Sequence, residues 1–254
     1  MERRPKAADL AAALRHELRL GDGYLDIFEV LRRLGIEVYR APFDDDSLEG
    51  AHEIRNGQPY IIVNSSRSIT RQRSTAAHEL GHNRLGHDKV YEASIEPSGD
   101  DGDEWDAYRF GRYFLMDPAG VEGLVTSMED EAERVAAVAS HFVVSPQLAA
   151  IHLAELHLIK TKTKADLLEG FRTNALRPAA FLRRYGYRMA ATEQDVREVD
   201  PGHAGRAMRA YASGLMTLEA LADTLLVTLE EAAEHVRDAG LTAPTDDDGP
   251  GPGG

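Results

Sequence analysis

The chain has 254 residues, of which 43% are hydrophobic and 28% charged, a composition that fits one or two globular domains. It contains no cysteine, which excludes disulfides and restricts any metal site to histidine and carboxylate ligands. The formal charge of −14 argues against general nucleic-acid binding, although arginine-rich stretches at 71–73 and 177–188 leave room for a local basic patch. We see no secretory signal and no long apolar run, and therefore expect a cytoplasmic protein with no membrane partner.

The N-terminal part is predicted to contain two helices and a small sheet. Apolar residues recur at helical spacing in the first two segments, and Gly35 ends the second, as glycine often does. Asn56-Gly57 is typical of a type I′ turn and predicts a hairpin between the strands on either side of it. The predicted elements are helices at 6–20 and 24–34 and strands at 36–39, 51–55 and 59–64, with an acidic loop at 43–50.

The remainder is predicted to be helical. A helix over 67–87 would be capped by Ser66 or Ser68, and a polar loop at 93–103 separates it from the next helix. Ser145-Pro146 fits the start of a later helix and predicts a tight turn before it. The other expected helices are 103–116, 129–141, 145–156, 206–213, 217–225 and 229–239, and the Asp-, Pro- and Gly-rich tail at 244–254 is expected to be disordered.

The segment Thr75–His82 contains the most informative motif of the chain. Two histidines four residues apart on a helix are offset by only about 40° around its axis, so His78 and His82 point to one side. They can supply two of zinc's roughly tetrahedral ligand positions, and Glu79 can act as the general base, which is the His-Glu-x-x-His pattern of zinc peptidases. Such a motif also occurs by chance on helix surfaces, but its small and apolar neighbours indicate a partly buried helix.

A site of this kind needs a third protein ligand. Glu104 is the preferred candidate, because on a helix over 103–116 it shares the apolar stripe that faces the interior, whereas Asp106 should point outward. His87 could support a ligand from behind, but a solvated or capping histidine is the preferred interpretation. The other candidates are Glu92, Glu96, Asp100, Asp101 and Asp103, of which the aspartates are expected to cap the helix or solvate the loop.

Two segments resemble the signatures of the ImmA/IrrE family of bacterial metallopeptidases. Residues 73–87, with the run RSTAAHELGH, are similar to the zinc-site helix of that family. Residues 104–118, EWDAYRFGRYFLMDP, are similar to its acidic helix that ends in a Phe-Ala-x-x-Leu-Leu-Met-Pro-like run. The match covers about residues 10–160 and implies that Glu104, the first acid of this helix, is the third zinc ligand.

The sequence differs from the family pattern at three positions. Tyr108 stands where the family usually has Asn or Asp, Gly111 replaces Ala, and Asp117 is inserted before Pro118. These changes concern groups around the ligands and leave the ligand assignment as it is. Tyr108, Tyr113 and His87 remain open as candidates for the side chain that stabilises the oxyanion.

The family resemblance also implies a helix-turn-helix-like unit after this run, and residues 132–159 fit one. A plain helical hairpin covering the peptidase core fits them equally well. The second helix, 146–156, contains no Arg or Lys, so we expect a scaffold or protein-docking role and no specific DNA binding.

The sequence therefore predicts an α+β fold: a minimal zincin-like metallopeptidase core with a small N-terminal sheet, followed by a helical, helix-turn-helix-like C-terminal region. We expect a peptidase domain at 1–125, a helix-turn-helix-like unit at 126–164 and a helical regulatory or docking region at 165–243. The resemblance implies a Zn²⁺-dependent regulatory endopeptidase that cleaves a helix-turn-helix repressor and so derepresses stress or mobile-element genes. The alternatives are a transcription regulator with a structural metal and a non-peptidase zinc hydrolase.

Overall fold

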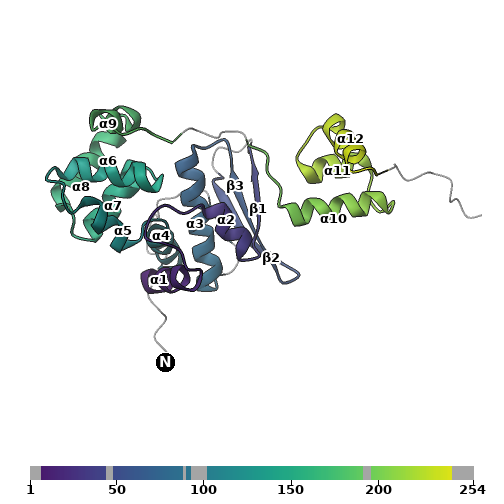
Figure 1. Cartoon of the computed structure of the whole chain (residues 1–254), viewed down its shortest axis with the longest axis horizontal. Coiled ribbons are helices and arrows are strands. Elements are labelled where there is room, and N and C mark those ends of the chain that lie inside the picture. The colour runs from purple at the N-terminus through teal and green to yellow at the C-terminus, as the bar shows by residue number, and fades with distance from the viewer. Residues whose placement is uncertain (1–6, 44–47, 88–89, 93–101, 191–195, 242–254) are drawn as a thin grey trace, which may run out of the picture.

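The computed structural model describes residues 7–43, 48–87, 90–92, 102–190 and 196–241, and its architecture is mixed α+β, as predicted (Figure 1). The sheet and its helices form the middle of the molecule, a group of helices lies at one end, and a three-helix unit lies at the other. The tail that is predicted to be disordered lies outside the described residues, as do parts of both predicted loops.

The sheet has four strands in the order β1-β3-β2-β4. β1 runs parallel to β3, whereas β2 pairs antiparallel with both β3 and β4. Asn56 and Gly57 have positive φ angles of 51° and 80°, the conformation of a type I′ turn, which confirms the predicted hairpin. The strands are β1 (Glu37–Ala41), β2 (Gly50–Arg55), β3 (Gln58–Asn64) and β4 (Val90–Glu92), of which β4 was not predicted.

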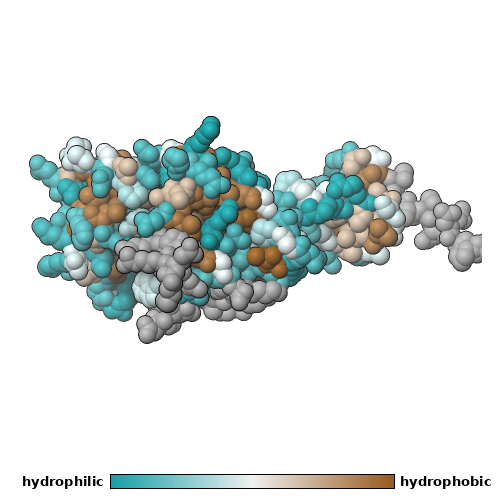
Figure 2. Space-filling view, turned by 90° about the horizontal axis from the view of Figure 1, so that it is seen from below, coloured by the Kyte–Doolittle hydropathy of each residue, from teal (hydrophilic) through white to brown (hydrophobic). Residues whose placement is uncertain are grey.

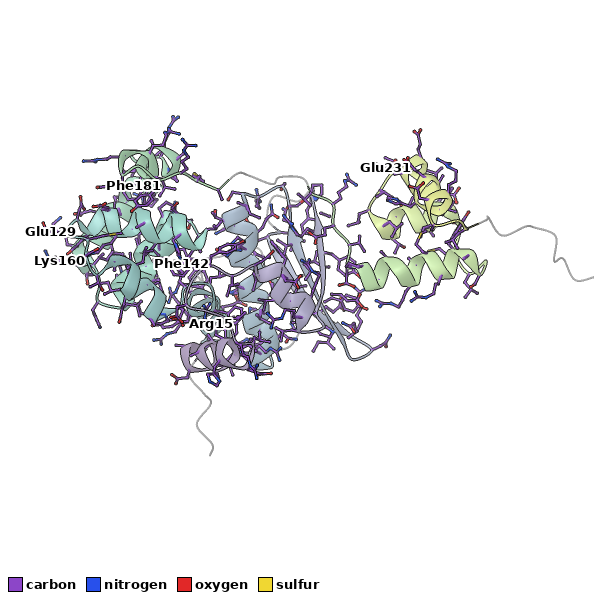
Figure 3. All side chains as sticks on the ribbon, viewed as in Figure 1. Arg15, Glu129, Phe142, Lys160, Phe181 and Glu231 are labelled. Atoms are coloured by element: carbon purple, nitrogen blue, oxygen red, sulfur yellow. The ribbon has the colours of Figure 1, made fainter. Side chains whose placement is uncertain are left out.

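Helix α3 (Ile69–Leu85) contacts strands β2 and β3 and packs closely against α4 (Gly102–Leu115). Ser68 occupies the N-cap position of α3, although its side chain makes no capping hydrogen bond. Helices α1 (Ala7–Glu17) and α2 (Ile27–Arg33) cover this pair. The buried Arg15, labelled in Figure 3, donates to the carbonyl of Phe114 at 2.6 Å and so fixes α1 to the end of α4.

Five further helices extend the same hydrophobic core. They are α5 (Pro118–Val125), α6 (Glu131–Phe142), α7 (Pro146–Glu155), α8 (Thr161–Arg172) and α9 (Pro178–Arg184). Phe171 of α8 and Phe181 of α9 meet edge to face at 5.3 Å and belong to the core that includes α3 and α4. The predicted boundary between residues 164 and 165 therefore falls in the first turn of α8, a helix that packs on α7.

The turn between α6 and α7 is tight, as the Ser145-Pro146 pattern predicted. Val143 is left-handed, the N–H of Val144 bonds to the carbonyl of Ala139 at 3.1 Å, and Ser145 caps α7. Buried Arg73 of α3 holds this turn by donating to the Val143 carbonyl at 3.1 Å. No single helix among the described residues is long and apolar enough to cross a membrane, and α6 and α7 meet those criteria only when taken together across their 115° bend.

The three-helix unit comprises α10 (Pro201–Ala212), α11 (Leu218–Leu225) and α12 (Leu229–Asp238). It has a small core of its own, formed by Ala207, Tyr211, Leu221 and Val236. The turn between α11 and α12 repeats that between α6 and α7: Leu226 is left-handed, and the N–H of Val227 bonds to the carbonyl of Ala222 at 3.1 Å. Apolar side chains gather on part of its surface among hydrophilic ones (Figure 2).

Candidate metal centre

The two histidines of the motif converge on one side of α3. The Nε2 atoms of His78 and His82 lie 2.9 Å apart, and the side chains are 3% and 0% exposed. The helical geometry explains this convergence, because residues i and i+4 lie one above the other on the same face. Both rings therefore direct the same nitrogen into one small space.

Glu104 reaches the same space from the first turn of α4. Its Oε2 atom lies 3.2 Å from His78 Nε2, and its Oε1 atom lies 3.2 Å from His82 Nε2. Asp106 is exposed, so the predicted orientation of both acids agrees with the structure. Within the described ranges, one group of histidine and carboxylate side chains lies close enough together to hold a metal ion. It consists of His78, His82 and Glu104.

Close contact between the backbones of α3 and α4 brings Glu104 to the histidines. A Cβ atom added to Gly81 of α3 would lie 2.8 Å from the carbonyl oxygen of Ala107 on α4. A Cβ atom added to Gly111 of α4 would lie 3.1 Å from the backbone nitrogen of His78. The departure from the family pattern at Gly111 is thus part of a helix contact that only small residues permit.

The donor atoms fit a four-coordinate divalent metal. In a tetrahedral zinc site with bonds of about 2.0–2.2 Å, neighbouring donors lie roughly 3.3 Å apart. The observed separations of 2.9, 3.2 and 3.2 Å are close to one triangular face of such a site. Three protein ligands leave a fourth position open, as in catalytic zinc sites.

The protonation states of these groups also suit a metal. Burial, reinforced by the neighbouring His78, lowers the pKa of His82 to about 3, so this imidazole is neutral at neutral pH. A hydrogen bond from His78 lowers the pKa of the Glu104 carboxyl, which keeps it ionised. A metal ligand must be a neutral imidazole or an ionised carboxylate, and both conditions hold at neutral pH.

Glu79 is buried completely between α3 and the sheet. Its side chain is 0% exposed, and a Cβ atom added to Gly50 of β2 would lie 3.5 Å from Glu79 Oε1. The absence of a side chain at Gly50 therefore leaves space beside this carboxylate and beside Thr75. Glu79 directly follows the first histidine of the cluster in sequence but is not a member of the cluster. This position is the one expected of a general base.

A chain of polar groups supports His82 from behind. His82 Nδ1 lies 2.8 Å from His87 Nδ1, and His87 Nε2 lies 3.4 Å from Asp103 Oδ1. If Nε2 of His82 provides its lone pair to a metal, its Nδ1–H donates to His87, whose Nε2–H then faces Asp103. The His87 side chain is only 6% exposed, so the interpretation of His87 as a solvated residue is wrong.

A second polar contact, which the sequence did not predict, lies on this side of α3. Asn83 Nδ2 lies 3.1 Å from Nε2 of the buried His52 on β2. Burial, together with nearby His87, lowers the pKa of His52. The signal for this contact in the sequence is a histidine on a predicted strand that precedes the motif helix. Only the fold, however, brings His52 and Asn83 together.

The remaining candidates lie in different places. The Tyr108 ring lies 6.3 Å from that of His78, whereas Tyr113 packs on His152, away from the cluster. Glu92 lies in β4, but its side chain is outside the described part of the structure. Glu96, Asp100 and Asp101 are also outside the described residues.

A small mixed sheet, a motif helix with two convergent histidines and a second helix that supplies a carboxylate define a domain of the metallopeptidase class. Residues 31–154, from α2 to α7, match the model of the Peptidase_M78 family, described as the IrrE N-terminal-like domain. This match confirms, for residues 31–154, the resemblance to the ImmA/IrrE family seen in the sequence. The matched domain supports a metallopeptidase-like function at this coarse level. A search of curated proteins finds no match to the chain.

Proposed function

We propose that the protein is a zinc-dependent endopeptidase of the His-Glu-x-x-His type, with His78, His82 and Glu104 as ligands and Glu79 as general base. The observation that carries the proposal is the convergence of two imidazole nitrogens and a carboxylate within 2.9–3.2 Å of one another. Zinc is favoured because it combines imidazole and carboxylate ligands in four-coordinate sites with one open position. The family to which the domain belongs supports peptide hydrolysis as the reaction.

Each residue has a separate part in this reaction. When bound, zinc would supply Lewis acidity to the scissile carbonyl and to the attacking water. Glu79 takes the proton from that water and later delivers it to the leaving amine. His87 and Asp103 fix the tautomer and ring orientation of His82, since a ligating imidazole needs a partner for its second nitrogen.

The proposed substrate is a helix-turn-helix transcriptional repressor, whose cleavage in the cytoplasm would release stress or mobile-element genes. This part of the proposal rests on the family resemblance. Restricted access would suit a protease with one regulatory target, and the buried cluster is in keeping with such restriction.

Specific binding to duplex DNA is not part of the proposed function. Every residue of α7, the second helix of the first helix-turn-helix-like unit, is buried or half-buried, so α7 has no free face to place in a groove. The exposed face of α12 carries Glu230, Glu231 and Glu234, which would repel phosphates. A nanomolar, sequence-selective complex with duplex DNA at about 150 mM salt would contradict this prediction and favour a regulator with a structural metal.

Two substitutions separate a catalytic metal from a structural one. Glu79→Gln removes the base but no ligand, so it should fold, retain one bound metal and cleave the repressor at least about 10²-fold more slowly. Glu104→Gln replaces a ligand by a neutral amide, so it should lower metal affinity, lose activity at limiting zinc and partly recover it with excess zinc. Elemental analysis, zinc titration and cleavage of repressors whose genes neighbour this one provide the measurements. Full cleavage by Glu79→Gln would disprove the hydrolytic mechanism, and unchanged zinc binding by Glu104→Gln would disprove the third ligand.

A further inference from the structure

A cavity of about 320 Å³ lies between α2, the start of α3 and the segment that precedes α10. Its volume is at the lower end of the range of small-ligand sites. Its described lining includes three arginines and two carboxylates: Arg32, Arg40, Arg73, Asp26 and Glu198. Positive charge is therefore in excess here, in a chain whose overall charge is −14. None of the three candidate metal ligands belongs to this described lining, so the cavity is a separate site.

Arg73 is a buried cation that forms no ion pair with any described carboxylate. Its hydrogen bonds go to neutral oxygens instead, which belong to Tyr24, Leu25, Phe142 and Val143. Only the bond to Tyr24 uses Nη1, which carries two hydrogens, so one N–H of Arg73 remains for a further acceptor. Burial lowers the pKa of Arg73, and the nearby Tyr24 and Asp26 offset this only in part. An anion in the cavity would supply the missing negative charge.

Glu198 already occupies part of the cavity in the manner of an anionic ligand. Its Oε1 atom lies 2.9 Å from Arg32 Nη1, and its Oε2 atom lies 2.9 Å from Arg40 Nη1. Proteins bind free carboxylate and phosphate groups by such charge-assisted hydrogen bonds from arginine. The Glu198 side chain is 31% exposed, so it can exchange this ion pair for water at little cost. Arg40 is fixed independently of Glu198, because it donates to Gln72 Oε1 at 3.0 and 2.8 Å.

We propose that this cavity binds a small molecule with a phosphate group, which takes the place of the Glu198 carboxylate between Arg32 and Arg40. A phosphate group offers one oxygen to each of these arginines and a third oxygen to the remaining N–H of Arg73.

The charges of the cavity favour a dianion. Once the Glu198 carboxylate has left, the three arginines face Asp26 alone among the described lining residues. Asp26 is engaged in capping α2, where its Oδ1 atom accepts from the N–H groups of Phe28 and Glu29. The resulting excess of two positive charges matches the charge of a phosphate group better than that of a single carboxylate. Because the phosphate group and Glu198 exclude each other, each weakens the binding of the other by the same factor.

The test is calorimetric titration of the full chain at constant ionic strength, without added zinc because zinc itself binds phosphate. Inorganic phosphate and glycerol 3-phosphate are the probes, and the tighter of the two identifies the source of the phosphate group. Glu198→Gln removes the competing charge, and Arg32→Gln removes a donor that is 30% exposed and therefore dispensable for folding. The matched controls are Glu169→Gln and Arg172→Gln, which make the same charge changes in an exposed ion pair of α8 outside the cavity.

The parent should bind one phosphate per chain. Glu198→Gln should bind it about tenfold more tightly and Arg32→Gln about tenfold more weakly, whereas both controls should match the parent. Binding by Glu198→Gln alone would also support the site, with Glu198 as the competing anion. Parental affinity in Arg32→Gln would place the phosphate elsewhere and overturn the proposal. Parental affinity in Glu198→Gln would overturn the exchange, and no binding by either protein up to about 10 mM phosphate would overturn the site itself.

Discussion

His152 shows how the surroundings of a residue decide between a structural and a chemical role. Its ring is completely buried where α7 meets the end of α4, and its Nε2–H donates to the carbonyl of Met116 at 2.9 Å. Burial, with the neighbouring positive charge of Arg112, lowers the pKa of His152 to about 3. The ring is therefore neutral in the folded protein and holds two helices together, away from the candidate metal centre.

This shift predicts an acid-dependent loss of stability. An unfolded histidine has a pKa of about 6.5, so below that pH the unfolded chain binds a proton that folded His152 does not. The stability that neutral His152 contributes is fully present above pH 6.5. As the pH falls towards 3, the free energy of unfolding decreases by up to about 1.4 kcal/mol per pH unit. His152→Gln keeps a donor for Met116 and should flatten the fall in unfolding free energy between pH 6.5 and 4.5. Denaturant titrations of the zinc-loaded parent and variant at several pH values measure the unfolding free energy. If it fell equally with pH in both proteins, His152 would not be the group responsible.

For single residues, the sequence predicts the direction of a side chain when that direction depends only on the geometry of its own helix. His78 and His82 follow from i, i+4 spacing, and the inward Glu104 and outward Asp106 follow from the apolar stripe of α4. The contacts of His87 with His82 and of His52 with Asn83 could not be predicted, because each depends on the path of the chain beyond a single element.

At the scale of elements, the candidate metal centre depends on how closely α3 and α4 approach. Gly81 and Gly111 allow backbone contact at the level of the ligands, and a side chain at Gly81 would meet the Ala107 backbone and push the two helices apart. Overpacking of such a contact typically costs about 1–3 kcal/mol.

We therefore predict that Gly81→Ala moves α4 away from α3 and with it Glu104. The added methyl group would lie 2.8 Å from the Ala107 carbonyl, so the variant should unfold more easily by about 1–3 kcal/mol and bind zinc more weakly. Gly123→Ala on α5 is the matched control, because its added methyl group meets no atom within 4 Å and should be neutral or slightly stabilising. Thermal unfolding and zinc titration of both variants test the prediction, and a Gly81→Ala protein with parental zinc affinity would contradict it.

The elements with strong local signals were those that could be predicted. The hairpin, α3, α4 and the α6–α7 turn have an Asn-Gly turn, helical periodicity or a Ser-Pro start. Strand β4 has three residues and exists through its pairing with β2, which no local pattern shows. Helix α5 was missed although Asp117 caps it and Pro118 begins it, so the residue inserted relative to the family pattern has a structural role.

At the scale of the whole molecule, the α10–α12 unit is attached to the sheet by polar contacts. Arg206 of α10 pairs with the buried Glu37 of β1, and His203 meets Tyr39 edge to face at 5.3 Å. Before α10, Glu198 pairs with Arg32 and Arg40 at 2.9 Å each. The two hydrophobic cores share no residue.

A chain ending after Val199 should therefore fold and bind one zinc ion with parental affinity. The core around α3 and α4 is complete without α10–α12, and ion pairs at a surface usually contribute only about 0–1 kcal/mol. Circular dichroism, thermal unfolding and zinc titration of the shortened and full-length chains provide the comparison. Loss of zinc binding on truncation would show that the three-helix unit is part of the metal centre.

The short segment around Glu198 has a further consequence for how copies of this protein behave towards one another. Its backbone exchanges hydrogen bonds of 2.9 and 2.8 Å with Arg40 on the outer side of β1. A bare strand edge is a template on which a second chain can add, and this segment covers the edge of β1 at Arg40. We therefore predict that a chain ending after Met189 self-associates more readily than one ending after Val199, in which this stretch of linker still covers part of the β1 edge.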